Sequence, residues 1–204
     1  MARSIPRPLR RAELPADTAA LARYLIGKSV VRVVADGAMA GRIVETEAYP
    51  VGDASCHAFN GRTERNAALF LRRGHAYVYF TYGMWQMLNV SSEHAGVGAG
   101  VLIRAVEPVL GIDLMARNRP GASERVIAAG PGRLCQAMAI GSALNGIDLC
   151  RSGPLWLGAD IREAVAPDAI GVSVRIGISR EIDRPLRFYL RGSRYLSGPR
   201  SLSP

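Results

Sequence analysis

The hydrophobic positions of the chain recur with two different periods, which predicts both strands and short helices. Alternating or β-branched apolar runs predict strands at 29–34, 39–47, 101–106, 155–157, 172–176 and 186–190, and two more within 74–92. The first two strands are separated by Asp36-Gly37, a pair typical of a tight hairpin turn. The two strands within 74–92 are expected to meet near Tyr82-Gly83.

Helix signals occur at three places. Asp17 or Thr18 can cap a short amphipathic helix that Gly27 ends. Pro108 suits the first turn of a second helix, and the segment 130–141 opens with Gly-Pro, which favours entry into a third. Several strands with a few helices among them indicate an α+β fold.

The domain organisation follows from where these elements lie. Residues 1–16 are basic and are interrupted by three prolines, so we expect a flexible basic N-terminal arm. Residues 17–204 contain no internal repeat and no linker-like stretch, and a chain of 204 residues with 49% hydrophobic composition is long enough for one packed core. The sequence therefore predicts a single domain over 17–204.

The chain is strongly basic, with 26 Lys and Arg against 17 Asp and Glu and a net charge of +9. Lys28 is the sole lysine, so arginine supplies nearly all of the positive charge. Guanidinium groups bind phosphate oxygens in a two-pronged geometry, and this balance favours a polyanionic partner such as nucleic acid. A genome rich in G and C would also enrich arginine, so composition alone leaves both explanations open.

Several classes of protein lose support because their patterns are missing. Cys56, Cys135 and Cys150 are too few and too scattered for a disulfide framework or a zinc site. The uncharged stretch 74–92 carries too many polar and strand-favouring residues for a membrane helix, and 1–16 lack the apolar segment of a secretory signal. Phosphate-binding loops and dinucleotide fingerprints are also missing. From these missing patterns together, we expect a cytoplasmic protein without membrane association, metal or cofactor.

Two acids and a phenol near the end of the second strand are the first candidates for chemistry. On an extended chain Glu45, Glu47 and Tyr49 fall on one face, where they can form the wall of a pocket. A solvated strand edge is the alternative for two acids in this position. His57 in the following loop and Arg104 on a later strand favour the pocket.

Aromatic residues concentrate in the segment 77–85. Tyr77 and Tyr79 share one strand face and Val78 and Phe80 the other, so one pair is expected to pack inside while the other faces a pocket or solvent. Core packing explains Phe80 most simply. Tyrosines beside a turn in a basic protein can alternatively stack on nucleic-acid bases.

Arginines flank this aromatic segment and are candidates for phosphate contacts. Arg62 and Arg65 precede it, and Arg133 lies at the Gly-Pro helix entry, where free amide groups favour an anion. We expect these three side chains to contact a DNA backbone. Solvated surface charge is the alternative for any one of them.

Seven segments, taken together, match one known family in their order and spacing. They are GRIVETEAY at 41–49, His57, GRTERN at 61–66, YVYFTYGMWQMLNVSS at 77–92, VLIRAVEP at 101–108, GPGRLCQAMAI at 130–140 and PLRFYLRGS at 185–193. This set resembles the alkyladenine (3-methyladenine) DNA glycosylase family.

The resemblance implies a fold and a reaction. The fold would be a mostly antiparallel, curved β-sheet surrounded by helices. The reaction would be base-excision repair, in which a damaged purine is flipped out of double-stranded DNA and its N-glycosidic bond is hydrolysed to leave an abasic site. The expected substrates are 3-methyladenine, 7-methylguanine, hypoxanthine and ethenoadenine, and the expected protein is a bacterial, nucleoid-associated monomer.

The resemblance also implies roles for residues that match the family's motifs. Glu47 corresponds to the general base and Arg104 to the arginine that helps hold the attacking water. The residues that correspond to the pocket for the flipped base are Tyr49, His57, Tyr79 and Asn89. Asn89 would discriminate against the 2-amino group of guanine. Tyr82 would fill the space left in the DNA, with Met84 beside it.

Two further features bear on the mechanism. Lys28 lies outside every matched segment, so we expect no Schiff base and predict a monofunctional enzyme that does not cut the strand. The alternatives are a non-catalytic DNA- or RNA-binding module and a hydrolase of free nucleosides. The presence of both Glu47 and Arg104 favours catalysis over simple binding, which needs neither residue.

Overall fold

The structure of the protein, a computed structural model, describes residues 5–81, 83–159 and 162–203. The strands are β1 (Ser29–Val34), β2 (Gly37–Tyr49), β3 (Ala76–Thr81), β4 (Trp85–Ser91), β5 (Gly100–Leu110), β6 (Leu155–Gly158), β7 (Ile170–Ser173) and β8 (Arg187–Leu190). The α-helices are α1 (Thr18–Tyr24), α2 (Ile112–Asn118) and α3 (Pro131–Ala137). Short 3-10 helices occur at Arg11–Glu13, Ala67–Phe70, Ser142–Leu144, Pro167–Ala169 and Arg200–Leu202.

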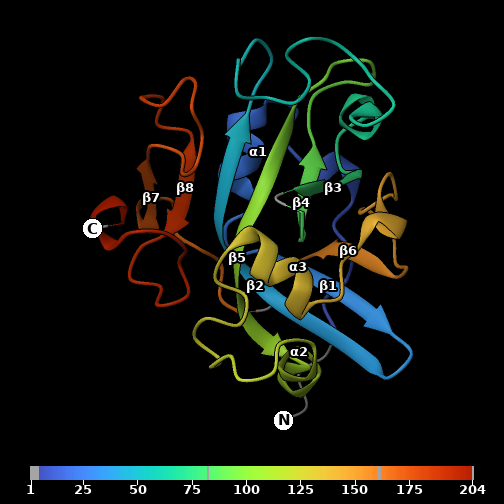
Figure 1. The fold of residues 1–204 in the computed structure, drawn as a ribbon, viewed down its shortest axis with the longest axis vertical. Helices are drawn as coiled ribbons and strands as arrows, with labels where there is room; N and C mark the ends of the chain where they lie inside the picture. The colour runs from blue at the N-terminus through green and yellow to red at the C-terminus, as the bar shows by residue number, and fades with distance from the viewer. Residues whose placement is uncertain (1–4, 82, 160–161, 204) are drawn as a thin grey trace.

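The strands form one antiparallel sheet in the order β3-β4-β5-β2-β1-β6, to which β8 is joined through β2 and β7 through β8. β2 is long enough to pair with two strands along one edge, because residues 37–42 pair with β1 and 45–47 with β8. The sheet is strongly curved, and the β7–β8 hairpin lies at one side of it (Figure 1). This architecture confirms the predicted α+β fold with a curved antiparallel sheet.

Two β-bulges in the β2–β5 pair decide which side chains face the core. Between the pairs Ile43↔Val106 and Glu45↔Ala105 the register leaves Val44 as an extra residue on β2. The next pair is Thr46↔Ile103, which leaves Arg104 as an extra residue on β5. A bulge shifts the alternation of side chains by one position. The core face of β2 therefore changes from the odd position Ile43 to the even positions 46 and 48, and Glu45 and Glu47 lie on the opposite face.

The main hydrophobic core lies between the sheet and the helices. α1 packs on β2 and β5, and α3 packs on β4 and β5. The Asp17 carboxylate caps α1 as predicted, accepting a hydrogen bond from the Ala20 amide at 2.7 Å. The Thr46 hydroxyl donates to the Ala22 carbonyl at 2.9 Å and so joins β2 to the middle of α1.

The predicted second helix is present, but the prediction that it begins at Pro108 is wrong. Pro108 lies in β5 opposite Gly41, and α2 begins only at Ile112, after Gly111 with a φ of 67°. β4 pairs with β5 only at residues 100–102, so one edge of β5 has no paired strand near Pro108, and a residue without an N–H is tolerated there. The predicted third helix does begin at the Gly-Pro pair, but it ends at Ala137 rather than near 141.

The expectation of a flexible N-terminal arm is also wrong for residues 5–16, which pack against the domain. Leu9 and Leu14 are buried, and the Leu9 amide donates to the Leu157 carbonyl at 2.8 Å. The indole of Trp156 donates to the Pro6 carbonyl at 3.1 Å. The extended segment pairs with the end of β6, where the Ala159 amide also donates to the Arg7 carbonyl at 2.9 Å, beside Pro6 and Pro8, which have no N–H to donate.

Candidate active site

A cavity of about 500 Å³ opens beside β2, β4 and β5 on the face opposite the main core. Aromatic side chains, small residues and a few polar groups form its wall. The lining residues that the sequence singled out are Tyr49, His57, Tyr79, Asn89 and Arg104. The structure thus brings together five of the predicted site residues, although they come from four segments of the chain.

Glu47 lies directly behind this wall and is fully buried. Its Oε1 is 3.1 Å from Nη1 of Arg104 and accepts a hydrogen bond from the Ile176 amide at 2.7 Å. Its Oε2 accepts a hydrogen bond from the Tyr49 hydroxyl at 2.9 Å. All three partners line the cavity, so the carboxylate is one side-chain layer away from it.

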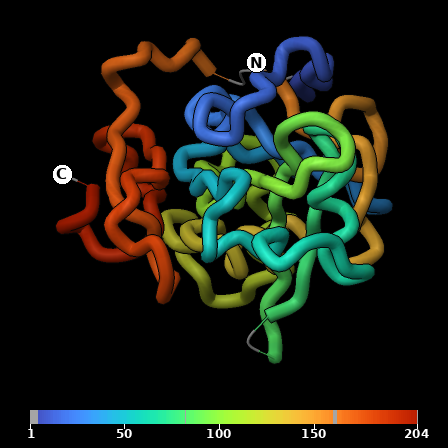
Figure 2. The backbone as a smooth tube through the Cα atoms, turned by 90° about the horizontal axis from the view of Figure 1, so that it is seen from above, coloured from blue at the N-terminus to red at the C-terminus, as the bar shows by residue number. Residues whose placement is uncertain are grey.

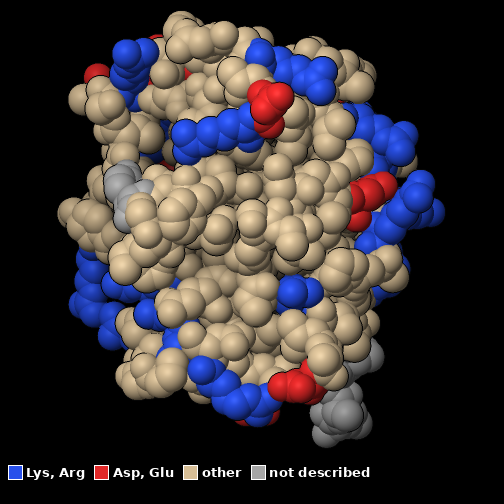
Figure 3. Space-filling view, turned by 45° about the vertical axis from the view of Figure 1, so that its right-hand side comes forward, with Lys and Arg blue, Asp and Glu red and all other residues tan. Residues whose placement is uncertain are grey.

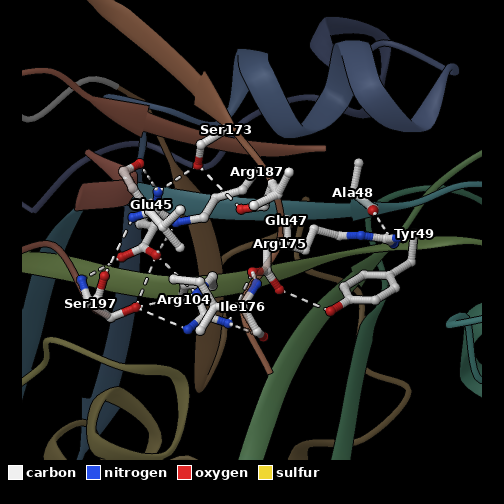
Figure 4. A network of polar contacts seen from close by, with 12 residues as sticks. Glu45, Glu47, Ala48, Tyr49, Arg104, Ser173, Arg175, Ile176, Arg187 and Ser197 are labelled. Carbon is white, nitrogen blue, oxygen red and sulfur yellow. Dashed lines mark hydrogen bonds and ion pairs between the residues drawn. The ribbon is translucent and has the colours of Figure 1, made fainter. Parts of the chain in front are cut away.

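Glu45 is the centre of a second, deeper network, which Figure 4 shows beside Glu47. Its carboxylate accepts hydrogen bonds from Nε of Arg104 at 2.9 Å and Nε of Arg187 at 2.7 Å. The Ser197 amide and hydroxyl complete the set at 2.6 and 2.9 Å. Buried charges persist only when they are paired and hydrogen-bonded, and each group here has several partners. The acids are therefore not a solvated strand edge, which was the alternative interpretation.

Arg104 connects the two acids to the cavity. Burial acts to lower the pKa of its guanidinium, but attraction to Glu47 and Glu45 outweighs burial and raises the pKa. Nη1 also donates to the Ile176 carbonyl at 3.4 Å. A permanently charged donor thus lies between a buried carboxylate and a backbone carbonyl at the edge of the cavity.

Aromatic rings build the opposite wall. His57 Nδ1 lies 2.9 Å from the Tyr77 hydroxyl, and the rings of His57 and Tyr79 are 4.4 Å apart. Burial raises the pKa of Tyr77 to about 12, so its hydroxyl stays protonated at neutral pH. Part of His57 is exposed at the cavity mouth, yet burial of the remainder, with a contribution from Arg65, lowers the pKa of the imidazole.

Asn89 is buried on β4, opposite Tyr77 on β3. Its amide nitrogen is held by the carbonyl of Tyr77 at 3.2 Å and that of Met87 at 3.4 Å. Because both amide protons are directed to backbone, the carbonyl oxygen is the polar atom left for the cavity.

The β3–β4 hairpin carries the predicted insertion residues. Tyr82 lies outside the described residues, whereas Met84 at the turn is 67% exposed. Phe80 is 53% exposed, so the prediction that it packs in the core is wrong, although Val78 on the same strand face does lie in the core. Figure 2 shows the end of this hairpin extending beyond the rest of the chain.

The arginines predicted for phosphate contact are exposed around this region. Arg65 donates to the Phe80 carbonyl at 3.3 Å, and Arg133 follows Pro131, which lines the cavity. Arg62 lies in the same exposed loop as Arg65. In the face shown in Figure 3, basic side chains are spread over the surface and outnumber the acidic ones.

Some residues of the site were not anticipated from the sequence. Ile176 and Arg187 hold the site, and Arg175 and Asp53 lie directly behind Tyr49. Ile176 and Arg175 fall in the predicted strand 172–176, but β7 ends at Ser173 and leaves them in a loop that reaches the cavity. Only the run PLRFYLRGS, already part of the resemblance, pointed to Arg187.

An aromatic cavity, with a carboxylate and an arginine buried behind its wall and an exposed apolar hairpin, suits an enzyme that handles a nucleobase. The chain belongs to the methylpurine-DNA glycosylase (MPG) family, whose model matches residues 12–194. It is therefore a DNA glycosylase, a hydrolase of base-excision repair with DNA as its substrate. This confirms the resemblance stated from the motifs.

Relatives from other organisms agree with this assignment. A protein of Mesorhizobium japonicum is 60% identical over 96% of this chain and 92% of its own length. One from Paraburkholderia phytofirmans is 51% identical over 96% and 90%, and one from Carboxydothermus hydrogenoformans is 45% identical over 89% and 94%. All three carry the provisional name 3-methyladenine DNA glycosylase. Among the described residues, no helix is long and apolar enough to cross a membrane.

Proposed function

We propose that this glycosylase flips damaged purines out of duplex DNA into the cavity and hydrolyses their N-glycosidic bond with Glu47 as the general base. The observation that carries the proposal is the contact between Glu47 and Arg104 directly behind the cavity wall. A duplex hides the bond at C1′, so the nucleotide must leave the stack before a water molecule can reach it.

The chemistry follows from the charges around Glu47. Departure of the purine leaves a sugar with oxocarbenium character, which a nearby carboxylate stabilises. The same carboxylate accepts a proton from the attacking water. Arg104 and the Ile176 carbonyl both lie at the cavity edge beside Glu47, so a water held between them is within reach of the base.

The remaining predicted residues take up the nucleotide and the DNA. Tyr49, His57 and Tyr79 line the cavity and stack on the flipped base, while the Asn89 side chain fills the space that the 2-amino group of guanine would need. Tyr82 with Met84 fills the gap in the helix, and Arg62, Arg65 and Arg133 bind phosphates. The substrates are 3-methyladenine, 7-methylguanine, hypoxanthine and ethenoadenine.

A monofunctional reaction fits the surroundings of the sole lysine. Lys28 lies under the ring of Tyr24, 4.9 Å from its centre, and is absent from the cavity lining. Strand cleavage through a Schiff base requires an amine at the sugar. We therefore expect an abasic product and no borohydride-trapped complex with DNA.

Glu47→Gln tests the assignment of the base. Single-turnover excision of hypoxanthine from a duplex should fall by at least about 10²-fold, because general base catalysis is lost. Binding to a duplex with an abasic analogue should persist, as measured by fluorescence anisotropy. Glu163→Gln, on an exposed loop, is the control and should excise at the normal rate.

Two outcomes of this assay would count against the proposal. A near-normal rate for Glu47→Gln removes Glu47 from the mechanism. Binding without any base release by the unaltered protein, over all four lesions, favours the non-catalytic binding module.

A further inference from the structure

Arg175 and Asp53 form an ion pair that is buried behind Tyr49. Nη1 of Arg175 lies 2.5 Å from Oδ2 of Asp53, and both side chains are fully buried. The Arg175 guanidinium carbon is 4.7 Å from the centre of the Tyr49 ring. Neither Asp53 nor Arg175 lines the cavity, so the ion pair lies one layer of side chains outside it.

This pair joins three segments that shape the cavity. Arg175 donates to the Ala48 carbonyl at 3.0 Å and so holds the end of β2. Asp53 accepts from the Ser55 amide at 2.8 Å, in the loop that leads to His57. Arg175 also immediately precedes Ile176, whose amide binds Glu47.

Stability alone does not explain why a charged pair occupies this position. Removing two charges from water is costly, and a buried ion pair is often no more stable than apolar residues of the same volume. Nε of Arg175 is buried and finds no hydrogen-bond partner among the described residues, which adds to the cost. The group that these charges adjoin is the ring of Tyr49.

The Tyr49 ring both lines the cavity and contacts the Arg175 guanidinium. An aromatic ring has two faces, and the Arg175 guanidinium covers one of them in a cation–π arrangement. The other face is then the one available to the cavity. A base stacked there lies about 9 Å from the guanidinium, near enough for its charge to be felt across a buried ring.

We propose that Arg175 and Asp53 are positioning residues that hold Tyr49 and Ile176 around Glu47, and that the neutrality of this pair lets Tyr49 accept cationic as well as neutral bases. The proposal rests on the proposed function, because it assumes that a flipped base stacks on Tyr49. N7-methylguanine in DNA carries a positive charge, whereas hypoxanthine is neutral. Asp53 cancels the Arg175 charge that would otherwise repel the cationic base.

The test compares single-turnover excision of 7-methylguanine and hypoxanthine from matched duplexes. Asp53→Asn leaves Arg175 uncompensated, and the ratio of the 7-methylguanine rate to the hypoxanthine rate should fall about tenfold, as expected for like charges at this distance. Arg175→Met leaves the negative charge of Asp53, and the same ratio should rise. The opposite signs distinguish a charge effect from a loss of packing.

Two further variants act as controls. Arg184→Gln removes a cation that also lies near Asp53, at 3.6 Å, but whose side chain is 41% exposed; the ratio should be unchanged. The double variant Asp53→Asn with Arg175→Met restores neutrality and should return the ratio to within about twofold of the unaltered protein. If circular dichroism shows that Asp53→Asn alone does not fold, the double variant still allows the ratio to be measured without the Asp53 charge.

The outcomes separate this proposal from the proposed function. If both single variants lower the two rates by the same factor, the pair is merely structural and the proposal is overturned. If the unaltered protein releases neither base, the proposed function fails first. A ratio that moves in opposite directions for the two variants supports the charge balance that the proposal assigns to the pair.

Discussion

Glu45 and Glu47 lie two positions apart on β2, yet their surroundings suit different tasks. Glu45 is held by Arg187, Ser197 and Arg104, of which Arg104 lines the cavity, and Glu45 itself does not line it. Glu47 contacts three residues that do line it. Burial and hydrogen-bond partners, rather than residue type, therefore separate the structural acid from the candidate base.

Glu45→Gln should reduce stability strongly. The free energy of unfolding is expected to fall by about 3–5 kcal/mol, because the buried guanidinium groups of Arg104 and Arg187 lose a shared charge. Urea denaturation followed by circular dichroism measures this change. Glu163→Gln should stay within about 0.5 kcal/mol. An unchanged urea midpoint for Glu45→Gln would mean that the network relaxes around the amide.

His57 should make stability depend on pH in the weakly acidic range. Its pKa in the folded protein is lowered by burial and by Arg65, so the folded state binds fewer protons than the unfolded chain. The stabilisation from neutral His57 is fully present above the ordinary histidine pKa of about 6.5 and is lost as the pH falls from there through the lower pKa of the folded protein. Thermal unfolding at pH 7.5 and 5.5 should therefore show a larger drop for the unaltered protein than for His57→Gln. Equal drops would contradict the assignment.

At the scale of secondary-structure elements, the paired bulges in β2 and β5 are the feature that places the site. Val44 and Arg104 are each an extra residue on their strand, so the alternation shifts on both strands at the same level. Strict alternation from Ile43 would have placed Glu45 and Glu47 on the core face with it. The bulges instead turn both acids toward Arg104 and the cavity.

The contact between α3 and the β3–β4 hairpin should also be sensitive to added volume. A Cβ at Gly132 would lie 2.7 Å from the Trp85 ring, so Gly132→Ala must move the helix or the indole. We expect a loss of about 1–3 kcal/mol in the free energy of unfolding and weaker binding to an abasic-site duplex. Gly141→Ala, with open space and an extended backbone, is the matched control and should change neither quantity. Equal behaviour of the two variants would exclude tight packing at Gly132.

At the scale of the whole molecule, the arginines that give the chain its net charge of +9 occur in two kinds of environment. Arg104, Arg175 and Arg187 are buried and paired with acids. Arg62, Arg65 and Arg133 are exposed near the cavity and the hairpin. Only the exposed arginines are free to attract DNA over a distance, because a buried pair carries little net field.

DNA binding should therefore fall steeply with salt. With about four to six phosphate contacts, the affinity for an abasic-site duplex should drop about 10²–10³-fold between 50 and 200 mM salt. Fluorescence anisotropy over this range measures the slope. A hydrolase of free nucleosides would show almost no salt effect on its excision rate, so a flat response would favour that alternative.

Local sequence determined much of the fold and the choice of site residues. The Asp17 cap, the strand at 29–34 and the Gly-Pro entry to α3 depend on neighbours within a few positions, and all three are found as predicted. The motifs that carry the resemblance also identified Glu47 and Arg104, which the structure places 3.1 Å apart. These signals are readable because each depends on a short stretch of chain or on a matched motif.

Only the tertiary structure decided the rest. The bulges, the exposure of Phe80 and the packing of residues 5–16 depend on partners that local periodicity does not contain. The Arg175–Asp53 hydrogen bond spans 122 positions, and that between Ser197 and Glu45 spans 152. A residue buries a charge only where the folded chain supplies its counter-charge, and this pairing exists only after distant segments have packed together.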